Sequence, residues 1–173
     1  MQANPLLQYW HTPMGVHHFA NAQAVNEVLV RVFESMRATD VRLAGTLPKP
    51  FYASRDDLLG RIRLSEWDAL VAFIVDSVRQ TVVLANQGAW TEAKPGLHIA
   101  LRGVWFQTSN RGSHHDVHTH GNCSWSGVYC VQVDPQQPRE SHEVFGLLNG
   151  VTRFYGPYAH NLAGGAMDFG NAY

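Results

Sequence analysis

Four of the ten histidines of this 173-residue chain lie within seven residues: His114, His115, His118 and His120. Asp116 lies among them, and an apolar segment rich in β-forming residues follows from Ser126. Imidazole nitrogens are common protein ligands of zinc, iron, copper and nickel, and carboxylates join them in many such sites. The stretch therefore predicts a metal site at the start of a strand.

The spacing of these side chains narrows the choice of ligands. In an extended chain the even-numbered members of the stretch project to one face, whereas His115 projects to the other. Side chains two residues apart are about 6.6 Å apart along a strand and can share one ion, but His114 and His120 are about 20 Å apart. Two pairs are therefore candidates: His118 with His120, or His114 with Asp116. Either pair supplies two ligands of a three-ligand face that leaves coordination positions open.

Two long amphipathic helices precede this stretch. Apolar residues at helical spacing predict a helix over about 21–40, with Asn21 as its N-cap, and a second over about 65–87, with Ser65 as its N-cap. A turn over 54–59 that ends at Gly60 separates them. We expect the two helices to pack side by side on the outside of a sheet and to bury one stripe of side chains: Val28, Val32, Trp67, Leu70 and Ile74.

The second half of the chain has the period of two that is typical of strands. Leu97, Ile99 and Leu101 alternate with more polar neighbours, which predicts a strand that continues to Phe106. Further short strands are expected over 126–133 and 151–155, with a weaker edge strand over 15–19. Helices followed by strands predict an α+β fold in one domain over 1–173, helical in 1–95 and β-rich in 96–173.

Composition limits the classes of partner. Thirteen Lys and Arg against fourteen Asp and Glu give a net charge of −1 without charged blocks, so we expect a small molecule rather than nucleic acid or membrane. The N-terminal residues have neither a basic start nor a continuous apolar run, which predicts a cytoplasmic protein. Cys123 and Cys130 lie seven residues apart and form no CxxC pair, which disfavours zinc held by Cys123 with the histidines.

A set of motifs in this half resembles a known family. They are Trp105-x-Gln107, Gly112, His118-x-His120-Gly121-Asn122 and Ser126-Gly127-Val128-Tyr129. The pattern is similar to that of the 2-oxoglutarate- and Fe(II)-dependent oxygenases with a double-stranded β-helix. The resemblance implies a jelly-roll or cupin-like barrel with the two helices outside and with Fe(II) at its mouth. It implies His118 and His120 as metal ligands and 2-oxoglutarate as the cosubstrate in the hydroxylation of a small molecule.

The chain departs from the family pattern at three points. Cys130 stands where the pattern has a second tyrosine, and the pair is His-x-His rather than His-x-Asp, so a carboxylate ligand would have to come from Asp116. The family's distal histidine and its 2-oxoglutarate-binding arginine are expected on strands that would follow Tyr173. The barrel is therefore predicted to be incomplete at its C-terminal end, and this chain is expected to bind metal weakly and to turn over little 2-oxoglutarate.

Other residues could complete the site. His142 and His160 are the downstream histidines, and His160 is the alternative third ligand to one beyond Tyr173. Tyr129 and Arg153 are candidates for holding the cosubstrate, Arg153 because a guanidinium binds a carboxylate with two hydrogen bonds.

Two other functions stay open. One is a non-catalytic or degenerate metal-binding β-barrel module. The other is a cupin-type dioxygenase with three histidine ligands, which would consume O₂ without 2-oxoglutarate. Succinate release would distinguish the 2-oxoglutarate-dependent oxygenase from both of these alternatives. A homodimer stays open as the oligomeric state.

Overall fold

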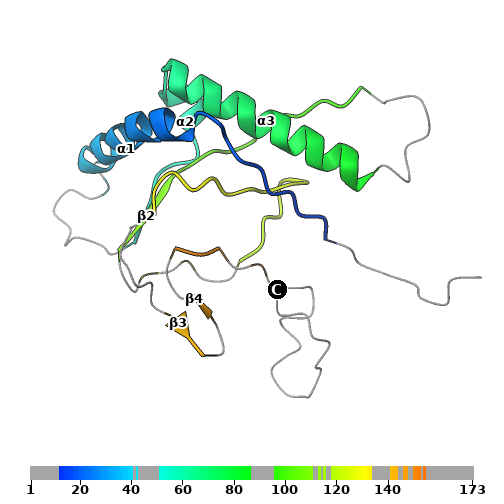
Figure 1. Cartoon of the computed structure of the whole chain (residues 1–173). Coiled ribbons are helices and arrows are strands. Elements are labelled where there is room, and N and C mark those ends of the chain that lie inside the picture. The colour runs from blue at the N-terminus through cyan, green and yellow to red at the C-terminus, as the bar shows by residue number, and fades with distance from the viewer. Residues whose placement is uncertain are drawn as a thin grey trace, which may run out of the picture. The chain divides into compact units, whose positions relative to one another are not determined.

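The computed structural model describes residues 12–40, 42, 51–86, 96–110, 113, 115, 118–133, 141–143, 146–147, 150–152 and 154. The chain divides into two compact units, Gly15–Pro135 and a second that joins Met1–Met14 to Gln136–Tyr173. The unit Gly15–Pro135 carries the histidine stretch and the long helices (Figure 1).

The two helices predicted from the apolar stripes are confirmed. Helix α1 spans Ala22–Ala38 and α3 spans Ser65–Ala85, and they lie side by side in Figure 1. The α1 residues Val25, Leu29 and Phe33 recur every four positions and are buried, because this spacing keeps side chains on one face of a helix. Of the stripe expected in the core, Trp67 and Leu70 are buried at 3% exposure and the three β-branched members are half-buried.

The predicted cap of α3 is wrong. Leu64 takes the N-cap position with an extended backbone, and no side chain caps the helix. Ser65 lies inside the helix, and its hydroxyl donates to Oε2 of Glu66 at 3.0 Å. Asn21 does take the N-cap position of α1, but its side chain makes no capping hydrogen bond.

A two-stranded antiparallel sheet lies against the helices. Strand β1, Phe51–Ala53, pairs with β2, Gln107–Ser109, so that Tyr52 faces Thr108. The sequence missed β1, and the strand expected over 97–106 begins later, at Gln107. Residues 97–102 do alternate between half-buried and exposed as predicted, but none of them lies in a strand. Backbone pairing needs a partner strand, which periodicity alone does not supply.

The two faces of this sheet have different neighbours. Phe106 is 6% exposed and stacks on Phe33 of α1, with ring centroids 4.3 Å apart. Tyr52 is buried beside it at 5.5 Å. Because side chains alternate along a strand, Phe51, Trp105 and Gln107 belong to the opposite face. The helices therefore cover one face and leave the other to the histidine stretch.

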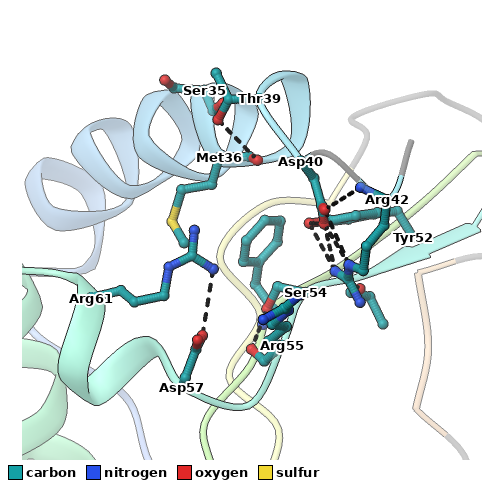
Figure 2. Close-up of polar contacts among 12 residues, drawn as sticks. Ser35, Met36, Thr39, Asp40, Arg42, Tyr52, Ser54, Arg55, Asp57 and Arg61 are labelled. Atoms are coloured by element: carbon teal, nitrogen blue, oxygen red, sulfur yellow. Dashed lines mark hydrogen bonds and ion pairs between the residues drawn. The ribbon is translucent and has the colours of Figure 1, made fainter. Parts of the chain in front are cut away.

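A polar network ties the end of α1 to β1. Tyr52 donates its hydroxyl to Oδ2 of Asp40 at 2.7 Å, and Arg42 donates to both carboxylate oxygens and to the carbonyl of Ala53 (Figure 2). The hydrogen bonds from Arg42, and then that from Tyr52, lower the pKa of Asp40 well below its ordinary value. Burial raises the pKa of Tyr52. The first turn of chain after α1 is thus fixed to the sheet.

The remaining short elements differ from expectation. Helix α2, Leu58–Arg61, runs through Gly60 rather than stopping there, because the Ile62 N–H still donates to the Leu58 carbonyl at 3.1 Å. No strand forms over 15–19 or 126–133, nor at the described positions 151, 152 and 154. In the smaller unit, β3, Ser141–His142, pairs antiparallel with β4, Gly146–Leu147. The described elements are α+β, and the barrel stays a prediction.

None of the helices in the described part of the chain is long and apolar enough to cross a membrane.

Candidate metal site

Three histidines of the histidine-rich stretch come together. The Nδ1 atoms of His115 and His118 are 2.8 Å apart, so one donates an N–H to the other. The His118 and His120 rings follow, with centroids 4.9 Å apart. In a straight strand these two residues would be about 10 Å apart and would project to opposite faces, so the contact between their rings departs from that pattern. His115 therefore joins the pair from which simple alternation had separated it.

Aromatic side chains from β1 and from the segment before β2 contact the two ends of this histidine group. The Phe51 ring lies 5.3 Å from that of His115, and the Trp105 ring lies 5.8 Å from that of His120. Phe51 comes from β1 and Trp105 from the segment that leads into β2, both on the face turned away from the helices. The five rings form a continuous row along this face, so the fold positions the imidazoles through aromatic contacts.

Trp105 and the three imidazoles border an open pocket of about 660 Å³. Its other lining residues are Gln107 and the segment 53–57 that follows β1. Backbone hydrogen bonds join this segment to the one before β2: Ser54 N–H donates to the Phe106 carbonyl at 3.0 Å and Val104 N–H to that of Asp56 at 3.2 Å. The Ser54 hydroxyl, which is 9% exposed as a residue, accepts from Phe106 N–H at 3.1 Å. Backbone hydrogen bonds thus fix the part of the pocket wall that residues 53–57 form.

This wall is charged. Asp57 accepts from Nη1 of Arg61 at 3.4 Å across one turn, an exposed pair of modest strength (Figure 2). The Asp56 side chain packs against Gly103. A Cβ at Gly103 would lie 3.4 Å from Oδ2 of Asp56. Arg55 also lines the pocket, and within the described residues it takes part in no ion pair.

The Nδ1 atoms of His115 and His118 are nearly as far apart as two nitrogens bound to one metal ion would be. Two nitrogens bound to one ion at about 2.1 Å, at angles of about 90 to 109°, are about 3.0 to 3.4 Å apart. The Nδ1 atoms of His115 and His118 are slightly closer because they share a proton, which must leave before both coordinate. As the described side chains stand, no three His, Cys, Asp or Glu residues form a set that could hold a metal.

Tyr129, a candidate for holding the cosubstrate, lies elsewhere. Its hydroxyl donates to Oδ1 of Asn26 on α1 at 2.9 Å, and its ring meets those of Phe19 and Phe73 edge-on at 6.3 Å. Burial raises its pKa. Tyr129 is not among the residues that line the pocket.

Several other candidates lie outside the described residues: His114, Asp116, Arg153, His160 and the side chain of His142. Both cysteines are free and exposed.

The histidines near the N-terminal end differ from each other. His18 is exposed, whereas His17 is half-buried, with Nε2 2.8 Å from Oγ1 of Thr81 on α3. Gly15 lies so close to the same hydroxyl that a Cβ there would overlap it. Neither histidine belongs to the pocket.

Sequence reasoning missed His115 and the wall formed by Arg55, Asp56 and Asp57. The local signal that could have found this wall is the alternation of Phe51, Tyr52 and Ala53, which indicates a short strand. Its pairing with β2 spans more than fifty residues, however, and spacing within one segment carries no such information. No known protein family, curated protein or solved structure matches this chain.

Proposed function

We propose that the chain is a 2-oxoglutarate- and Fe(II)-dependent oxygenase of the double-stranded β-helix type that acts on a small molecule in the cytoplasm. The observation that supports this most is the row of His115, His118 and His120 on the sheet face opposite the helices. The barrel that the sequence resembles has its helices outside and its metal inside. An imidazole cluster on the uncovered face agrees with that arrangement.

The residues of the pocket have separate roles in this proposal. His118 and His120 hold the metal as the matching His-x-His pair, and His115 supplies a third nitrogen once its hydrogen bond to His118 opens. Trp105 and Phe51 keep the outer imidazoles in place by ring contact. Fe(II) bound there would supply O₂ activation coupled to decarboxylation of 2-oxoglutarate.

A second candidate function follows from His115. Three imidazoles without a carboxylate are the ligand set of a cupin-type dioxygenase, which needs no 2-oxoglutarate. The contact between His115 and His118 favours this alternative, because it brings a third imidazole next to the His-x-His pair. A metal-binding module without catalysis would share the site but neither activity.

Metal uptake tests the site itself. His118→Ala combined with His120→Ala should abolish stoichiometric uptake of Fe(II) or Ni(II), measured by titration and elemental analysis. The matched control, His18→Ala with His98→Ala, removes two exposed imidazoles outside the pocket and should bind metal as the wild type does. Equal loss in both double variants, or loss in neither, would refute the proposal. Oxygen uptake with succinate release supports the first function, and oxygen uptake without succinate supports the second.

A further inference from the structure

We infer that the histidine pocket binds a neutral, polyhydroxylated ring of the pyranose type. This inference names the substrate class of the proposed function and rests on it for the reaction that follows binding. Besides the imidazoles, the pocket is lined by one partly exposed aromatic residue, Trp105, and by Gln107 and the consecutive residues Arg55, Asp56 and Asp57. An aromatic surface beside planar polar groups of several kinds suits a sugar.

Trp105 supplies apolar surface to the pocket. It is 39% exposed, although its ring contacts that of His120 at 5.8 Å. Tryptophan is highly buried on average, and Trp67 of this chain is only 3% exposed. An aromatic ring left open in a pocket offers a flat apolar face to a ligand. A pyranose ring has a face of C–H groups that packs on such a surface.

The polar side chains near Trp105 suit adjacent hydroxyl groups. A hydroxyl both donates and accepts, so two neighbouring hydroxyls need partners of both kinds. The carboxylates of Asp56 and Asp57 only accept, whereas the guanidinium of Arg55 only donates. The Gln107 amide does both. All four residues are exposed, so a ligand in the pocket has access to donors and to acceptors.

The charges of the pocket favour a neutral ligand. Arg55 contributes a positive charge, and Asp56 and Asp57 contribute negative charges. Asp57 also accepts from Arg61 at 3.4 Å, so the charges of this segment nearly balance. An anion would meet carboxylates and a cation would meet a guanidinium, and like charges placed together weaken binding. A neutral ring with several hydroxyls avoids both repulsions.

The main chain fixes these side chains relative to one another. Ser54 N–H donates to the Phe106 carbonyl at 3.0 Å. Because Ser54 precedes Arg55 and Phe106 follows Trp105, this bond holds the two pocket residues on neighbouring backbone segments. In the sheet, Gln107 pairs with the residue before Ser54. A pocket with a preformed backbone loses less conformational freedom when a ligand binds.

Binding is tested on the full chain without metal, by titration of the isotope-labelled protein followed in two-dimensional N–H NMR spectra. Trp105→Phe identifies the indole signal of Trp105 as the one that disappears. The methyl pyranosides of glucose, galactose and mannose are the neutral probes. At least one of them should shift the Trp105 indole signal at concentrations in the tens of millimolar or below.

Variants locate the binding site. Trp105→Ala should weaken the best probe about threefold to tenfold because its ring is lost, and Trp105→Phe should keep most of the affinity. Gln107→Ala should weaken the probe by a similar factor of about threefold to tenfold through lost hydrogen bonds. Gln80→Ala removes an exposed glutamine of α3 outside the pocket and should bind as the wild type does.

The amino sugar and the uronate with the same ring as the best probe add a positive and a negative charge, and both should bind more weakly than the neutral probe. The inference is overturned if no neutral probe shifts the Trp105 signal, if a charged sugar binds more tightly, or if Gln107→Ala and Gln80→Ala bind alike. No metal enters this titration. A chain that takes up metal but binds no pyranoside therefore refutes this inference alone, and one that binds a pyranoside but no metal refutes the proposed function alone.

Discussion

Phe106 and Gln107 are neighbours in sequence but face opposite sides of the sheet, so their replacement should have very different effects. Phe106 is 6% exposed and packs on two aromatic rings, Phe33 at 4.3 Å and Tyr52 at 5.5 Å. Phe106→Ala should lower the free energy of unfolding by about 3–5 kcal/mol, from lost burial and the cavity that remains. This is a large share of the roughly 5–15 kcal/mol that stabilises a typical domain.

Gln107→Ala is the matched control. Gln107 is exposed on the pocket face, so its truncation should change the free energy of unfolding by no more than about 0.5 kcal/mol. Urea unfolding followed by circular dichroism at 222 nm reports the loss of α1 and α3, and linear extrapolation gives the free energies. Equal losses for the two variants, or a loss below about 1 kcal/mol for Phe106→Ala, would mean that the helices do not cover this face.

Two further predictions concern the helices. Leu70→Ala should lower the free energy of unfolding by about 2–5 kcal/mol in the same assay, because Leu70 is 3% exposed. Leu84→Ala is the control and should change it little, because Leu84 is 62% exposed. Similar losses for the two variants would mean that the Leu70 face of α3 is not the buried one. The lowered pKa of Asp40 means that in acid the unfolded chain binds a proton at this carboxyl while the folded chain does not, so this part of the stability is present above about pH 4 and is lost as the pH falls further. Asp40→Asn should therefore flatten the decline of unfolding free energy below about pH 4, and an unchanged acid slope would contradict this role.

Local periodicity explains why the long helices were predictable. The stripe through Val25, Leu29 and Phe33 is set by neighbours within two turns, and burial follows from it. Strand β1 has only three residues, and its register with β2 depends on contacts more than fifty positions away. No local pattern reports such a pairing.

In the candidate site, too, some residues are indicated by local spacing and others are not. His118 and His120 were one of the two pairs that spacing allowed, and the structure brings their rings together. His115 was not expected beside them, because alternation along a straight strand places it on the opposite face. Arg55 comes from another segment altogether. What spacing misses is therefore whatever departs from a straight strand or depends on a distant partner.

The contact between His17 and Thr81 determines which ring nitrogen of His17 carries a hydrogen. The Thr81 hydroxyl has a single hydrogen, which it donates to the Ser77 carbonyl at 2.9 Å. The oxygen must therefore accept from His17, and the hydrogen of that 2.8 Å bond resides on Nε2. The segment that enters α1 is thus attached to α3 by a hydrogen bond that His17 donates to a hydroxyl already committed as a donor within its own helix.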